Sequence, residues 1–231
     1  MDTDVAIIGG SFAGLSAALP LARARRSITI MDTGAPRNRF AHASHGFLAQ
    51  DGNAPGDILA EARRQLAAYP TVRFAEAGSD SATGSVDAFS ILGTDGNSLS
   101  ARRIILAHGV VDSLPDIPGL AEQWGKRVAH CPYCHGYEFG GGSLGVIAAN
   151  GEVALHHAML VREWGPVTFF TNGVVEPDAE MLRQLAARDV TVDSRPVVSV
   201  QSCDSGLSIT LADGESAELA GIFTQPRSRL S

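Results

Sequence analysis

Two cysteines separated by two residues, Cys131-Pro132-Tyr133-Cys134, lie in the middle of this chain of 231 residues. A thiol pair with this spacing can cycle between dithiol and disulfide without refolding of the backbone, and one thiol can supply the attacking thiolate. Near its start the chain also carries a glycine-rich run, Gly9 to Gly14, directly after the apolar residues Val5 to Ile8. Together these features predict electron exchange between a bound dinucleotide cofactor and a redox-active dithiol.

Three kinds of site are open to the cysteine pair. Completed by His135, it matches the Cys-x-x-Cys-His sequence of covalent haem attachment, but that chemistry belongs to exported proteins. A structural zinc ion would need two more ligands, for which His130, His135 and Cys203 are the candidates, and there is no second close pair. We therefore favour the redox pair and predict no metal site.

The glycine-rich run has the form of a nucleotide-binding turn between a strand and a helix. Its residues are Gly9-Gly10-Ser11-Phe12-Ala13-Gly14, with Ser11 in place of the middle glycine of the usual pattern. Such glycines permit a tight bend and the close approach of a pyrophosphate to the helix N-terminus. The next strand, Ser27 to Met31, ends on Asp32, whose carboxylate can accept hydrogen bonds from a ribose.

A second strand, turn and helix follow the cysteines. Leu144 to Ala148 is a continuous apolar run, Ala149 to Gly151 a turn, and residues 152–164 have a helical pattern before a strand at 167–171. Pro115 and Pro118-Gly119 mark a crossing between two domains. The other expected elements are helices at 57–68 and 178–188, strands of a meander at 72–74 and between 88 and 99, a buried strand at 103–107, and strands between 190 and 223.

Composition excludes several classes of partner. The net charge is −7 and no basic stripe is visible, which argues against binding to nucleic acid. No apolar run reaches the roughly 18 residues of a membrane span. The first residues are acidic and lead directly into a strand pattern, without the features of a secretory signal, so a cytoplasmic location is expected.

Beyond these patterns, the chain resembles the low-molecular-weight thioredoxin reductase family, including the related dithiol oxidases that close disulfides in microbial metabolites. The resemblance covers essentially the whole chain and rests on the order of four motifs: the first glycine run, Ala107-His108-Gly109, Ile117-Pro118-Gly119 and Cys131-Pro132-Tyr133-Cys134-His135-Gly136-Tyr137-Glu138. It implies that FAD binds the first fold, and that the second fold carries the cysteine pair and a pyridine-nucleotide site.

The resemblance also implies roles for single residues. Cys134 would lie against the isoalloxazine ring and Cys131 would be the outer interchange thiol, while His135 shuttles the thiol proton and Glu138 orients His135. The expected catalytic residues are therefore Cys131, Cys134, His135 and Glu138. The expected cofactor-binding residues are Gly9, Gly10, Ser11, Phe12, Ala13, Gly14, Asp32, Arg39, Ala107 and Gly109.

Two segments depart from the family pattern. The second turn, Gly145 to Gly151, lacks closely spaced glycines, and Thr171 to Glu176 contains no Lys or Arg for the 2′-phosphate of NADPH. NAD(P)H is therefore a weaker expectation than FAD, and electrons can run instead from a dithiol to flavin and on to oxygen. Gly221 to Thr224 resembles the strand on which the family returns to the FAD fold, and the rest of that return lies outside these residues.

We therefore predict an α/β protein with two tandem Rossmann-like folds, the first lacking its C-terminal return segment. The expected domains are residues 1–113 for FAD, 114–222 for the NAD(P)-binding-like fold with the cysteines, and 223–231 for the start of the return. The predicted activity is FAD-dependent thiol–disulfide exchange on a small molecule or a thioredoxin-like protein, with a homodimer possible. The alternatives are a dithiol oxidase that uses oxygen and a non-catalytic nucleotide-binding redox sensor.

Overall fold

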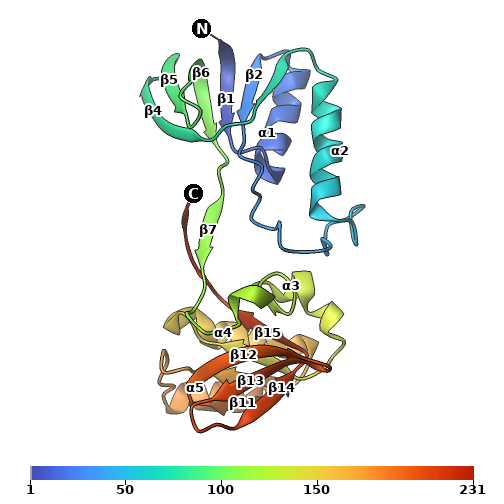
Figure 1. Ribbon diagram of the computed structural model, residues 1–231, viewed down its shortest axis with the longest axis vertical. Helices are drawn as coiled ribbons and strands as arrows, with labels where there is room; N and C mark the ends of the chain where they lie inside the picture. Colours follow the sequence, from blue (N-terminus) through green and yellow to red (C-terminus); the bar gives the residue numbers. More distant parts are fainter. Residues whose placement is uncertain (1) are drawn as a thin grey trace. The chain divides into compact units, whose positions relative to one another are not determined.

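The computed structural model describes residues 2–231, apart from the side chain of Glu152, and divides the chain into two compact units (Figure 1). The first unit contains the chain through Arg39, residues 53–111 and residues 230–231. The second contains residues 40–52 and 112–229. Strands β7 (Val110–Ser113) and β16 (Arg227–Leu230) form a separate two-stranded sheet. No helix of the described chain is long and apolar enough to cross a membrane.

The first unit is a six-stranded mixed sheet with two helices packed on it, α1 (Phe12–Arg23) and α2 (Pro55–Ala67) (Figure 1). Its strands are β1 (Thr3–Ile8), β2 (Ile28–Met31), β3 (Val72–Ala75), β4 (Ser79–Ser85), β5 (Ala88–Gly93) and β6 (Ser98–Leu106). They lie in the order β3-β2-β1-β6-β5-β4. Strand β1 is parallel to β2 and β6, as a nucleotide-binding fold requires.

Residues Val5 to Ile8 of β1 are buried on both faces of the sheet, which explains why this run is entirely apolar. Val5 and Ile7 pack against the helices together with Leu15 and Ala18. Ala6 and Ile8 point to the opposite face and pack with Ile91, Met31 and Ala101. The expected buried strand followed by a glycine turn and a helix is confirmed. A strand that is covered on both faces has no solvent-facing side, so its residues need not alternate between apolar and polar.

The expected meander is wrong in one strand. The segment at 72–74 belongs to β3, which pairs in parallel with β2. The antiparallel meander consists of β4, β5 and β6 instead. The sequence did not reveal β4 because its residues, Ser79-Asp80-Ser81-Ala82-Thr83-Gly84-Ser85, are almost all exposed and therefore carry no apolar alternation.

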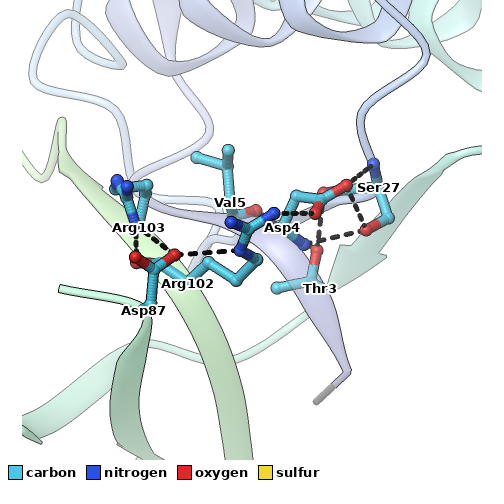
Figure 2. Close-up of polar contacts among 7 residues, drawn as sticks. All are labelled: Thr3, Asp4, Val5, Ser27, Asp87, Arg102 and Arg103. Atoms are coloured by element: carbon cyan, nitrogen blue, oxygen red, sulfur yellow. Dashed lines mark hydrogen bonds and ion pairs between the residues drawn. The ribbon is translucent and has the colours of Figure 1, made fainter.

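A polar cluster fixes the amino-terminal end of β1 to both neighbouring strands (Figure 2). The Asp4 carboxylate accepts the backbone N–H of Ser27 at 3.0 Å, and the Thr3 hydroxyl donates to the Ser27 carbonyl at 2.9 Å. On the other side, Arg102 lies 3.6 Å from Asp4 and also donates to Asp87 at 2.9 Å. The hydrogen bonds from Ser27 hold the pKa of Asp4 below its usual value. The glycine turn follows the opposite, carboxyl end of β1.

The second unit is a three-layer arrangement around a parallel sheet. The sheet has the order β11-β10-β9-β15-β8, and every pair in it is parallel. Its strands are β8 (Val128–Ala129), β9 (Leu144–Ile147), β10 (Val167–Phe170), β11 (Val190–Asp193) and β15 (Gly221–Thr224). Strand β15, in which we expected the return to the first fold to begin, thus pairs with β9 and β8 in this second sheet.

Different elements cover the two faces of this sheet. Helices α4 (Gly151–Val161) and α5 (Ala179–Ala187) pack on one face, where Val146, Phe169 and Phe223 are fully buried. The antiparallel sheet of β12 (Val197–Cys203), β13 (Gly206–Leu211) and β14 (Ser216–Leu219) covers the other. The smaller helices are η1 (Ala121–Gln123), α3 (Pro132–His135), η2 (Tyr137–Phe139) and η3 (Arg162–Trp164).

His157 of α4 is a titratable group inside this core. Its side chain is 2% exposed, and its ring lies 6.0 Å from the Phe223 ring and 6.3 Å from the His130 ring, measured between centroids. Its Nε2 has no hydrogen-bond partner among the described residues. Burial, followed by the neighbouring His130, lowers the pKa of His157 to about 4, so the folded protein holds this imidazole neutral.

His157 therefore makes stability depend on pH. The unfolded chain binds a proton at this histidine below about pH 6.5, whereas the folded protein does so only near pH 4. The stabilisation is complete above about pH 6.5 and is lost as the pH falls toward 4, by about 3 kcal/mol. Urea unfolding should show this loss in the native protein and not in His157→Gln, which cannot titrate. Equal pH dependence in both proteins would contradict the assignment.

Candidate active site

The glycine turn of the first unit is built by close backbone contacts. A Cβ atom on Gly9 would lie 2.2 Å from the Ala107 carbonyl oxygen, and one on Gly14 would lie 1.8 Å from the Gly9 carbonyl oxygen. Gly9 has a φ of 104°, which favours glycine, and a Cβ on Gly10 would lie 2.8 Å from the Cβ of Asp32. The Ala107 N–H donates to the Ile8 carbonyl at 2.7 Å. The structure thus brings Gly9, Gly10, Asp32 and Ala107 together, as the motif predicts.

The N-terminus of α1 fits a dinucleotide pyrophosphate. Ser11 precedes the helix, and its side chain forms no capping hydrogen bond. Phe12 and Ala13 begin the helix, and its first turn contains no acidic residue. The first backbone N–H groups of a helix have no partner inside the helix and favour a negative charge. The turn therefore offers the partial positive charge of a helix N-terminus and, at Gly9, Gly10 and Gly14, no side chain that would keep a phosphate away, so the residues present fit the dinucleotide that the motif implies.

Asp32 has a partner that the sequence did not reveal. Nη2 of Arg63, in α2, lies 3.1 Å from Asp32 Oδ2, and the Arg63 guanidinium also stacks over Phe74 at 4.9 Å from the ring centroid. Only one of the two carboxylate oxygens is used in this ion pair. The other can accept a ribose hydroxyl, with Arg63 fixing the orientation of the carboxylate. Arg63 lies on a polar helix with no recognisable motif, so nothing in the sequence marked it.

Two other expected cofactor residues lie in less defined surroundings. Arg39 is exposed and donates to the carbonyl of Pro36 in its own loop at 3.1 Å. Gly109 has a φ of 78°, with no atom within 4 Å of the position of a Cβ, and its carbonyl accepts the N–H of Ser231 at 3.3 Å. Their roles toward a cofactor stay predictions.

The two thiols of the second unit lie on one turn of chain. Cys131 has extended backbone angles and directly precedes α3, and Pro132 occupies the first helical position, which suits its fixed φ. The Cys134 N–H donates to the Cys131 carbonyl at 3.2 Å and so closes the turn. Both cysteines are half-buried, and Cys131, Cys134 and Cys203 are all free thiols in this structure. The turn therefore brings the two thiols within hydrogen-bonding distance of each other.

The surroundings of Cys134 favour the protonated thiol. Burial raises the pKa of the Cys134 thiol to about 12, and a hydrogen bond to Cys131 and the negative charges of Cys131 and Glu138 act in the same direction. Cys134 therefore holds its proton at neutral pH in the reduced pair and is a poor nucleophile in that form.

His135 directly follows Cys134 in the chain, and its surroundings favour the neutral imidazole. Burial lowers its pKa, and a positive charge on His45 acts in the same direction, whereas Glu138 opposes the shift. Its Nδ1 is buried and has no hydrogen-bond partner within the described chain. A neutral imidazole with an available nitrogen can accept a proton from a thiol. The structure also places His45, which the sequence did not single out, 3.5 Å from the Glu138 carboxylate.

In the second unit, a cavity of about 360 Å³ lies at the carboxyl ends of β9 and β10, where a Rossmann-like fold binds its nucleotide. Ala148, Ala149, Asn172 and Val174 line it, with Arg227 as its single cationic residue. Asn172 has a φ of 51°, and its Oδ1 accepts the Val197 N–H at 2.9 Å, so this side chain holds β12 in place. The segment after β10 thus presents no cluster of cations to a phosphate. No group of three His, Cys, Asp or Glu side chains in the described chain could hold a metal ion.

Comparison with known proteins identifies the family. Residues 3–224 match the pyridine nucleotide-disulphide oxidoreductases, and the chain belongs to this family. Thioredoxin reductase tcpT of Claviceps purpurea is 37% identical over 222 residues, which are 91% of this chain and 69% of the relative. Thioredoxin reductase aclD of Aspergillus oryzae is 35% identical over 93% of this chain and 72% of its own length.

A solved structure is also similar to this chain in sequence and fold. The oxidoreductase from Agrobacterium tumefaciens superposes with a TM-score of 0.94 and is 53% identical, covering 100% of this chain and 77% of its own. The predicted fold of two Rossmann-like units and the predicted class, a thioredoxin reductase-like oxidoreductase that uses FAD, are confirmed.

Replacement of Gly14 tests the nucleotide turn. Gly14→Ala would force a methyl group against the Gly9 carbonyl, and we expect a loss of at least ~2 kcal/mol in unfolding free energy together with loss of bound flavin. Gly56→Ala is the matched control, since a Cβ there meets no atom within 4 Å, and it should be neutral or stabilise by up to ~1 kcal/mol. Urea unfolding and the flavin absorbance of the purified variants measure both effects. Flavin content equal to wild type in Gly14→Ala would contradict the assignment.

Proposed function

We propose that the protein is a dithiol oxidase: the Cys131–Cys134 pair accepts two electrons from a dithiol, which leaves as a disulfide, and the electrons pass on to oxygen. Bound FAD supplies the two-electron acceptor for the reduced cysteine pair. The observation that carries the proposal is the contrast between the positions in the two units where a Rossmann-like fold binds its nucleotide. In the first unit, the glycine turn has no side chains that would keep a phosphate away. In the second unit, the cavity at the corresponding position has Arg227 as its single cationic lining residue, and the side chain of Asn172 there is hydrogen-bonded to the backbone of β12.

The residues of the second unit suggest an order of steps. A substrate thiol gives its proton to neutral His135, and the thiolate attacks Cys131 Sγ of the oxidised pair. The Cys131–Cys134 bond breaks, and Cys134 takes the proton from His135, which the raised pKa of its thiol favours. The second substrate thiol loses its proton in the same way and attacks the mixed disulfide. The substrate leaves as a disulfide, and Cys131 becomes a thiol, so electrons and protons balance.

A pyridine-nucleotide-driven thioredoxin reductase is the second candidate. It is favoured by the cavity beside Arg227 and by relatives that carry the name thioredoxin reductase. In that reaction the exchange runs backward, from the cysteine pair to a protein disulfide. NADH suits the segment after β10 better than NADPH, because no Lys or Arg there can pair with a 2′-phosphate.

The proposed substrate is a small dithiol rather than a thioredoxin-like protein, and the proposed location is the cytoplasm. With only three cysteines, two of them in one Cys-x-x-Cys pair, the chain has no disulfide framework of the kind found in secreted proteins. A homodimer stays a prediction of the family resemblance.

Electron flow separates the two candidates. When the purified flavoprotein is mixed without oxygen, a dithiol should bleach the visible flavin absorbance, whereas neither NADH nor NADPH should change it. The dithiol-reduced protein should regain its colour when air is admitted. Rapid bleaching by NADH or NADPH together with no response to dithiols would contradict the oxidase proposal and support the reductase.

Cysteine variants test the exchange step. Cys131→Ser and Cys134→Ser should each abolish dithiol turnover while the protein stays coloured, because each removes one half of the disulfide and neither lies in the glycine turn. Cys203→Ser is the control; its thiol contacts Ser205 at 3.1 Å in a different part of the unit, and turnover should be unchanged. Retained activity in either of the first two variants would refute the mechanism.

A further inference from the structure

His45 occupies a defined position between two carboxylates. Its Nε2 lies 3.5 Å from Glu138 Oε1, and its Nδ1 lies 3.7 Å from Asp51 Oδ1. The His45 side chain is 25% exposed, against 38% for Glu138 and 67% for Asp51, so the imidazole is the most buried of the three groups. Asp51 also accepts the backbone N–H of Gly46 at 2.8 Å, and this hydrogen bond holds the Asp51 carboxylate next to His45.

The segment that carries His45 belongs to the second unit, although in sequence it lies inside the first. Residues 40–52 group with residues 112–229. At one end a Cβ on Gly125 would lie 2.6 Å from the Cβ of Phe40, and near the middle the Cβ position of Gly46 lies 3.8 Å from the carbonyl of Tyr133, between the two cysteines. The segment is therefore packed against the turn that carries the thiols.

Glu138 connects His45 to the dithiol. Its charge raises the pKa of the Cys134 thiol and opposes the lowering of the pKa of His135. A positive charge on His45 acts on His135 in the opposite sense. The groups that face His45 are thus Asp51 from its own segment, Glu138 from η2 and His135 from α3. Interactions between charges weaken with distance. The mutual effects of Glu138, His45, His135 and the thiols on their pKa values therefore place these groups in one electrostatic site, to which Asp51 is joined through His45.

We propose that His45 is a positioning residue for thiol–disulfide exchange, which holds the Glu138 carboxylate where it stabilises the imidazolium of His135. The proposal deepens the function argued above and rests on it. In each half of the exchange His135 must carry one proton between the loss of a substrate S–H and the protonation of a leaving Cys134 or Cys131 thiolate. A carboxylate fixed nearby lowers the free energy of that protonated state, whereas a freely rotating one does so less well.

The test isolates the exchange step from the flavin reaction. The oxidised pair is reduced by dithiothreitol without oxygen in flavin-depleted protein and, for comparison, in the flavoprotein. Samples are quenched by acid, the free thiols are alkylated, and mass spectrometry follows their formation. Because dithiothreitol reduces the pair whichever physiological substrate the protein uses, this rate stays measurable even if aerobic dithiol turnover is absent. Failure of the oxidase proposal and failure of the His45 proposal are therefore distinguishable.

His45→Ala should slow the reduction about 10-fold near neutral pH, a modest part of what general acid–base catalysis contributes. His45→Gln keeps an N–H donor for Glu138 and should recover most of the rate. His42→Ala is the matched control, since His42 is an exposed histidine of the same segment, and it should match the wild type. A wild-type rate in His45→Ala, an equal loss in His45→Gln, or an equal loss in His42→Ala would each overturn the proposal.

Discussion

The proposed thiol–disulfide exchange depends on a single turn of backbone, closed by the hydrogen bond from the Cys134 N–H to the Cys131 carbonyl. This turn places both thiols within reach of each other without any rearrangement of the fold. The surroundings of Cys134 raise the pKa of its thiol, so this sulfur keeps its proton in the reduced pair. In the proposed exchange Cys134 is therefore the thiol that is protonated when the disulfide opens, and Cys131 is the sulfur that the substrate attacks. The proposed base, His135, directly follows Cys134 in the same short helix.

The first unit has a different constraint, which is the close contact of backbone with backbone. Gly14 lies against Gly9, and Gly9 lies against Ala107, at distances that exclude any side chain. The polar cluster of Asp4, Ser27 and Arg102 fixes the far end of β1 (Figure 2), so the turn projects from a strand that is held at both ends. A rigid strand with an open helix N-terminus is the arrangement that a pyrophosphate needs.

Most of the fold could be predicted from the sequence, because its decisive signals are local. The glycine run after β1, the apolar strands β9 and β10, and the cysteine spacing each specify their own structure. Strand β4 could not be predicted, since its side chains are exposed and leave no pattern, and β3 was placed in the wrong part of the sheet. The partners Arg63 and His45 were also missed. Each reaches the site through a contact between segments far apart in the sequence, Arg63 to Asp32 and His45 to Glu138, and no local rule marks such contacts.

In the proposed function Cys131 and Cys134 alternate between dithiol and disulfide, and Cys203 takes no part. Differential alkylation of the native protein can follow this exchange: the protein is treated with excess dithiol or with its disulfide, labelled, and digested for mass spectrometry. The peptide with residues 131 and 134 should carry two labels in the reduced protein and none in the oxidised protein, whereas Cys203 should be labelled equally in both. Two labels on that peptide in both states, or a disulfide that includes Cys203, would show that Cys131 and Cys134 are not the redox pair.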